Sequence, residues 1–105
     1  MNAPSPMISM AEAEATLARV DGVMRAKLDR AHVASKIVDW GHDLKAAGAC
    51  LLDVMTIRHA LEEEFGVEIT DKQELALLDM DRQGVANMME ALMRAGSAVQ
   101  AGAAA

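Results

Sequence analysis

The sequence predicts an all-α fold, and three observations support this class. Residues that favour helices, such as Ala, Leu, Met, Glu, Lys and Arg, dominate the composition. Runs of β-branched residues are nearly absent, and apolar residues recur at three- and four-residue steps. At 105 residues the chain can form one small domain with a single core. With one Trp, one Phe and no Tyr, that core must consist of Leu, Ile, Val and the nine Met, which repack easily.

The first predicted element is an amphipathic helix that starts at residue 9. Ser9 and Glu12 have the spacing of a capping box, in which the two side chains accept hydrogen bonds from backbone N–H groups at a helix start. Residues 1–8 contain both prolines and are predicted to be a flexible N-terminal arm, with the folded domain covering residues 9–96. The inward stripe of this helix is predicted to be Ala13, Leu17, Val20, Met24 and Leu28.

A long connection is predicted over residues 29–48, between the first and second helices. Gly41 and Gly48 are its expected bends. A loop of this length is unusual in a compact domain and tends to be functional. The side chains expected to fix it to the core are Ile37, Val38, Trp40 and Leu44.

The second helix is predicted over residues 51–64, with Phe65 closing its end. Residues 65–69 alternate apolar and polar side chains, a pattern that by itself fits a short strand. The side chains predicted to face inward are Leu52, Met55, Ala60 and Leu61.

Two further helices complete the prediction. Thr70 and Asp71 supply N-cap chemistry for a short helix over residues 72–79. Asp81 can cap a last helix, and Gly96 is predicted to end it, with residues 97–105 as a disordered tail. The stripe of the last helix is predicted to be Val85, Met88, Met89, Leu92 and Met93. A single core is expected to contain Leu52, Met55, Leu61, Phe65, Val67, Ile69, Val85, Met89 and Leu92.

The charge and the apolar pattern exclude several classes of function. A net charge of −6 disfavours binding to nucleic acid, which needs a basic face, and suits partners that present basic patches. No apolar run approaches the roughly 20 residues needed to span a bilayer, so no membrane insertion is expected. The N-terminal residues lack the pattern of a signal peptide, and a single Cys fits a reducing compartment. A cytoplasmic location is therefore predicted.

The most specific motif lies at residues 48–69. Ala-Leu-Glu-Glu-Glu-Phe at residues 60–65 resembles the end of the central helix of an acyl carrier protein, and Gly48 lies at the expected distance before it. Asp43-Leu44-x-x-x-Gly48 also matches the approach to that helix. The resemblance covers roughly residues 9–95. It implies a four-helix bundle with a long loop between helices 1 and 2, and an extended link rather than a strand after Phe65.

The residue that would carry the cofactor of this family is missing. Acyl carrier proteins have Asp-Ser-Leu at the start of the central helix, and the serine hydroxyl carries phosphopantetheine through a phosphodiester. This chain has Cys50-Leu51-Leu52 there, and Leu51 has no atom that could form the bond. Thr56 lies a turn inside the helix, and no serine (Ser5, Ser9, Ser35 or Ser97) lies at its start. No phosphopantetheine or other cofactor is therefore expected.

Cys50 leaves an alternative open. A helix N-terminus stabilises a thiolate through its dipole and free N–H groups, so a thioester on Cys50 would imitate the missing thiol arm. The ordinary state of a lone cysteine is a small, half-buried apolar residue, and the sequence shows no base next to this one. His42, across the connection, is the candidate base. The alternative function is thus an acyl or aminoacyl carrier loaded on Cys50.

No enzymatic or metal-binding motif is evident. The histidines do not have a metal-binding spacing, and one Cys is available to join them. No calcium loop, Gly-rich phosphate loop or nucleophile motif is present. The chain is therefore expected to have no catalytic residue, no metal and no enzymatic activity of its own.

The predicted function is protein binding. Acidic residues crowd the second helix and its end, and in acyl carrier proteins such a surface docks on basic patches of partner enzymes. A solvated helix face is the ordinary alternative. The resemblance implies a non-catalytic module for enzymes or regulators of acyl or aminoacyl carrier pathways, such as fatty acid or secondary metabolite biosynthesis. The residues predicted to contact the partner are Leu51, Asp53, Glu62, Glu63, Glu64 and Glu68.

Overall fold

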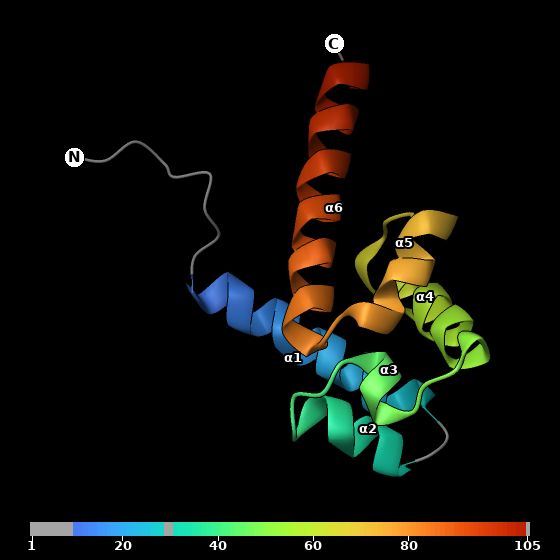
Figure 1. Cartoon of the computed structure of the whole chain (residues 1–105). Coiled ribbons are helices and arrows are strands. Elements are labelled where there is room, and N and C mark those ends of the chain that lie inside the picture. The colour runs from blue at the N-terminus through green and yellow to red at the C-terminus, as the bar shows by residue number, and fades with distance from the viewer. Residues whose placement is uncertain (1–9, 29–30, 105) are drawn as a thin grey trace.

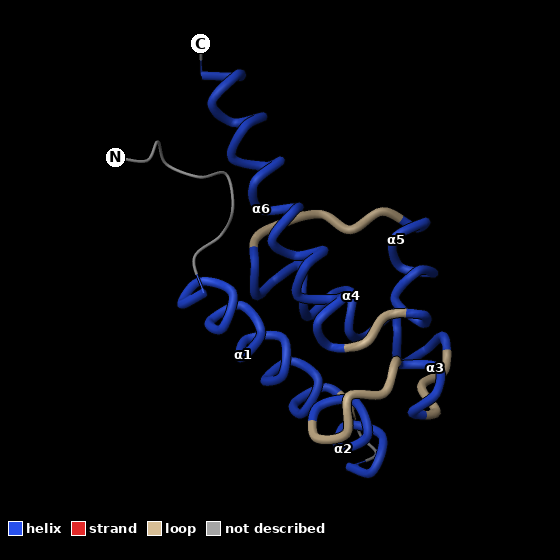
Figure 2. Tube along the Cα trace, turned by 60° about the vertical axis from the view of Figure 1, so that its left-hand side comes forward, coloured by secondary structure: helices blue, strands red, loops and turns tan. Residues whose placement is uncertain are grey.

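Helices surround one apolar core in the computed structural model of the chain (Figure 1). The structure describes the backbone of residues 10–28 and 31–104, and the side chains of residues 10–28 and 32–96. Every regular element in these ranges is helical (Figure 2), which confirms the all-α class. The elements are α1 (Met10–Lys27), α2 (Ala31–Val38), α3 (Leu44–Ala47), α4 (Leu51–Phe65), α5 (Asp71–Ala76), the 3₁₀ helix η1 (Leu77–Asp79) and α6 (Arg82–Ala104).

Helix α1 is the centre of the arrangement, since it packs against α2, α4 and α6. Helix α6 stands across α1, α4 and α5 lie to one side, and α2 and α3 lie at the C-terminal end of α1 (Figure 1). The C-terminal part of α6 extends away from the other helices in both views (Figures 1 and 2). In the described residues six α-helices therefore stand where four were predicted, and α2, α4 and α6 pack on α1.

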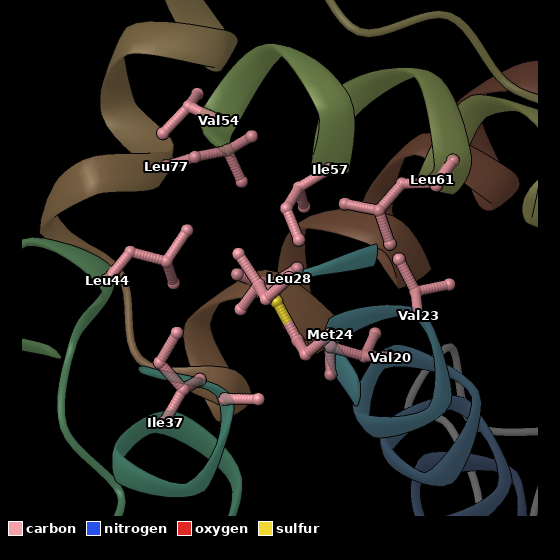
Figure 3. Close-up of a cluster of buried hydrophobic side chains, with 14 of the residues drawn as sticks. Val20, Val23, Met24, Leu28, Ile37, Leu44, Val54, Ile57, Leu61 and Leu77 are labelled. Atoms are coloured by element: carbon pink, nitrogen blue, oxygen red, sulfur yellow. The ribbon is translucent and has the colours of Figure 1, made fainter. Parts of the chain in front are cut away.

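The core is mainly aliphatic, and among the described residues Met24 and Met89 are its fully buried methionines. Figure 3 shows Met24 of α1 among side chains from α2, α4 and η1. Phe65, the one phenylalanine, is 8% exposed at the end of α4. Side chains with no exposed surface are Val20, Met24, Ile37, Leu44, Val54, Ile57, Leu61, Leu77, Val85 and Met89.

Helix α1 follows the predicted pattern. Val20, Met24 and Leu28 are buried, while Ala13 and Leu17 are half-buried toward the N-terminal end. The capping serine, Ser9, and the arm predicted at residues 1–8 lie outside the described residues.

The prediction of a long loop over residues 29–48 is wrong, because two helices occupy most of it. Asp43 begins α3 by accepting a hydrogen bond from the backbone N–H of Ala46 at 2.6 Å. Gly48 ends α3 with φ +97°, a left-handed conformation that glycine adopts without strain. Trp40, expected to anchor the segment, is 70% exposed. Helix α2 forms because it buries a helically spaced set, Val33, Ala34 and Ile37.

Helix α4 has the predicted span but a different inward face. Leu52 and Met55, expected in the core, are 70% and 47% exposed. The first turn of α4 is apolar on almost every side, so the sequence periodicity does not select one face there. Packing selects Val54, which lies beside Leu77 of η1 (Figure 3). The buried side of α4 is Val54, Ile57, Ala60, Leu61 and Phe65.

The link after α4, residues 67–70, has no regular secondary structure, so the short strand that its alternating pattern would allow does not form. Thr70 then begins α5 with a reciprocal capping box: its hydroxyl accepts from Gln73 N–H at 3.1 Å, and the Gln73 side chain accepts from Thr70 N–H at 2.8 Å. Ile69 is buried and Val67 half-buried, which confirms that the link contributes to the core.

The last helix begins as predicted and ends later. Asp81 accepts a hydrogen bond from Gly84 N–H at 2.8 Å, which is the expected cap. Val85 and Met89 are buried and Leu92 is half-buried. The predicted end at Gly96 is wrong, since α6 continues to Ala104. A glycine inside a helix costs only about 1 kcal/mol relative to alanine, and the alanine-rich sequence that follows favours helix.

Polar contacts fasten α1 to its neighbours. Arg82 at the start of α6 donates to both carboxylate oxygens of Asp21, at 2.9 and 2.5 Å, and this bidentate pair raises the pKa of Arg82. Arg25 donates to Asp39 at 2.5 Å, which lowers the pKa of that carboxyl. The Thr16 hydroxyl, which is buried, donates to Glu90 of α6. These contacts fix the positions of α2 and α6 relative to α1.

Candidate docking site at the start of helix α4

The junction before α4 is well defined. Cys50 is the N-cap residue in an extended conformation, and Leu51 is the first helical residue. The Asp53 carboxylate accepts a hydrogen bond from Cys50 N–H at 2.9 Å, which satisfies a backbone donor that the helix leaves free. Asp53 therefore has a structural role in starting the helix, and its contact with a partner stays a prediction.

Three large apolar side chains are exposed together on the first turn and a half of α4. Leu51 is 56% exposed, Leu52 70% and Met55 47%; we call these three residues the α4 patch. Leu51 and Met55 are four residues apart and share one edge of the helix, and Leu52 adjoins them. Thr56, the hydroxyl nearest the patch in sequence, donates to the backbone carbonyl of Leu52 at 3.0 Å. The patch is therefore an apolar surface at the start of α4.

Cys50 is exposed, so the expectation of a half-buried cysteine is wrong. Its thiol lies at the same loop–helix junction as Leu51. His42, the candidate base, lies beside Trp40, with ring centroids 6.0 Å apart. Among the described side chains, no group of three or more His, Cys, Asp and Glu is arranged to hold a metal ion.

Two of the predicted acidic contact residues are committed to the fold. Glu62 accepts a hydrogen bond from Ile69 N–H at 2.9 Å and so braces the link after α4. Glu64 accepts from the Arg19 Nε at 2.9 Å, and its backbone carbonyl accepts from the same guanidinium at 2.6 Å. Glu62 thus holds α4 to the link, and Glu64 holds α4 to α1.

The remaining acidic residues stay on the surface. Glu63 is exposed beside an open groove of about 520 Å³ between α1 and α4, to which Lys27 and Ala60 also contribute. Glu68 is exposed on the link. Of the predicted acidic surface, Glu63 and Glu68 are therefore the residues whose charge can be changed with least disturbance to the fold.

Arg58 has a structural role that the sequence did not predict. Its Nη1 donates to Asp71 at 2.8 Å and to Glu74 at 3.2 Å, and its Nε lies 3.6 Å from Glu62. The hydrogen bond that Arg58 donates to Asp71 raises the pKa of Arg58, against the opposing effect of burial. The four-residue spacing of Arg58 and Glu62 was visible in the sequence, but the two residues of α5 could be placed only by the fold.

The comparisons give no further identification. No helix in the described part of the chain is both long and apolar enough to cross a membrane. Comparison with protein-family models, with curated proteins and with solved structures finds no significant match to the chain. The resemblance to acyl carrier proteins therefore rests on the motifs at residues 43–69 and stays a hypothesis about the family.

Proposed function

We propose that the chain is a non-catalytic protein-binding module that docks on other proteins through the α4 patch. The observation that carries this proposal is the joint exposure of Leu51, Leu52 and Met55 on one short stretch of helix. Exposed apolar side chains that cluster in this way are typical of interaction sites, whereas single exposed ones are ordinary. The resemblance directs the proposal to enzymes or regulators of acyl or aminoacyl carrier pathways.

The energy of docking would come mainly from apolar burial. Covering a leucine or methionine side chain fully is worth roughly 1.5–3 kcal/mol, and the three side chains are already partly covered. The surrounding negative charge would act on the rate of encounter with a basic partner rather than on the strength of the final contact. Leu51 would supply an apolar contact at the position where a carrier would present a polar arm.

Leu52→Glu is expected to abolish docking, because it places a charge in the centre of the α4 patch. The measurement is competition: the chain should slow the modification of a reference acyl carrier protein by a phosphopantetheinyl transferase, or its use by other carrier-recognising enzymes in a panel. Trp40→Glu is the matched control, since Trp40 and Leu52 are both 70% exposed and Trp40 lies on the connection between α2 and α3. Equal competition by the parent and Leu52→Glu would exclude the α4 patch as the docking site.

Glu63→Lys should weaken docking moderately and reduce its dependence on salt. Charges at the rim of an interface mainly steer encounter, so the association rate should fall while the dissociation rate changes little. Glu63 is the suitable probe because replacing Glu62 or Glu64 would also break contacts within the fold. Association rates measured at several salt concentrations test this, and an unchanged salt dependence would remove Glu63 from the docking surface.

The second candidate function is a carrier loaded on Cys50, and the exposure of that cysteine favours it. In such a step the Cys50 thiolate would attack an acyl-coenzyme A thioester, forming an acyl-cysteine and releasing the coenzyme A thiol. Incubation with acyl-coenzyme A, followed by intact mass measurement of the parent and Cys50→Ser, tests this route. An acyl adduct present on the parent and absent from Cys50→Ser would support a carrier role.

A further inference from the structure

Helix α5 differs from the other helices in how it is held. None of its side chains is buried, although it lies beside α4 at one edge of the molecule (Figure 1). Leu75, in its last turn, is 59% exposed. Helices in small proteins are held mainly by burying an apolar face. Something other than apolar burial by α5 itself must therefore keep it against α4.

Arg58 of α4 supplies that attachment. It reaches Asp71 in the first turn of α5 at 2.8 Å and Glu74 one turn later at 3.2 Å. The Arg58 side chain is 21% exposed and that of Glu74 20%, so this pair is shielded from solvent, whereas Asp71 is 96% exposed. The Arg58–Glu74 contact is thus expected to be the stronger of the two.

The charges around Arg58 are unbalanced. Three carboxylates, those of Glu62, Asp71 and Glu74, converge on one guanidinium. A groove of about 370 Å³ beside it is also lined by Glu68. If the guanidinium leaves, the carboxylates of α4 and α5 repel one another. Burial of Ile69 and Leu77 anchors the chain on either side of α5, and between them the ion pairs of α5 with α4 depend on one cation among several carboxylates.

The attachment lies next to the α4 patch. Leu51, Met55, Arg58 and Glu62 follow one another at three- and four-residue steps and so share one edge of α4. Movement of α5 away from Arg58 would uncover the next turn of this same edge. The exposed surface would then continue from Met55 along α4.

We propose that α5 is a flap fastened by Arg58, and that its release enlarges the docking surface that begins at the α4 patch. The flap would pivot about two points. One is the link before Thr70, and the other is Leu77, whose side chain is fully buried. A partner with a basic patch would open it by supplying a cation to Asp71 and Glu74 in place of Arg58. This coupling to a partner rests on the docking role proposed for the patch, whereas the flap itself is a property of the chain alone.

Hydrogen–deuterium exchange of the chain alone tests the flap. In Arg58→Met, which keeps an apolar stem and removes the charge, the backbone amides of α5 should exchange roughly five- to tenfold faster than in the parent. Those of α1 and α6 should change by less than about twofold. Arg25→Met is the matched control, because it removes an arginine ion pair that joins α1 to Asp39, and it should leave α5 unchanged.

Two further measurements keep the result interpretable. Glu74→Gln retains Arg58 and should accelerate exchange in α5 by a smaller factor, even if Arg58→Met proves too unstable to study. Raising the salt concentration should accelerate amide exchange in α5 more in the parent than in Arg58→Met, because the attachment is electrostatic. Unchanged exchange in α5, or equal acceleration of all helices in both variants, would overturn the flap. Neither result depends on the competition assay with Leu52→Glu, so the two proposals can fail separately.

Discussion

Phe65→Ala is expected to lower the free energy of unfolding by roughly 3–5 kcal/mol, the usual cost of removing a buried aromatic ring. The Phe65 side chain is 8% exposed and closes the C-terminal end of α4 against the core. The Arg19 guanidinium also lies over its ring, with the central carbon 4.2 Å from the ring centroid. The substitution therefore removes core packing and a cation–π contact that supports the Arg19–Glu64 ion pair.

Unfolding in urea, followed by circular dichroism, measures this loss. Leu75→Ala is the matched control, because Leu75 is 59% exposed and its removal should change the free energy of unfolding by less than about 0.5 kcal/mol. A loss below about 1 kcal/mol in Phe65→Ala would mean that the ring is not part of the core.

The second prediction is that the parent chain carries no phosphopantetheine. Transfer needs a nucleophilic hydroxyl at the loop–helix junction, and Leu51 presents an exposed but inert side chain there. Intact mass should remain unchanged after incubation with coenzyme A and a permissive phosphopantetheinyl transferase. Leu51→Ser should gain the mass of the cofactor, although only in part of the molecules, because Cys50 stands where carriers have Asp.

The mass comparison also tests the loss of the carrier reaction and the family resemblance. A phosphopantetheine adduct on the parent would contradict the proposed loss of the carrier reaction, and peptide mapping would then show whether Cys50, Thr56 or a serine carries it. An unmodified Leu51→Ser would count against the family resemblance itself, since the junction would then fail to act as a carrier junction even with the hydroxyl restored. Modification of Leu51→Ser alone is the expected result.

Local sequence chemistry predicted much of the fold. N-cap chemistry at Thr70 and at Asp81 predicted the starts of α5 and α6, and apolar spacing predicted α1 and the span of α4. Each of these signals acts within about one helical turn, between residues close in sequence. Helix α2 has eight residues, which is too short for its apolar spacing to distinguish a helix from a connection held by single side chains.

The candidate site also has features that local sequence determines and features that depend on the fold. The sequence by itself determined that residue 51 is a leucine without a hydroxyl, at the start of a helix whose end is acidic. Only the tertiary structure decided that Val54 rather than Leu52 faces the core, and that Glu62 and Glu64 hold the fold while Glu63 stays exposed. Side-chain chemistry is a property of one residue, whereas burial and ion pairing depend on partners far away in the chain. Arg19 and Glu64 are separated by 45 residues, and no local pattern records their contact.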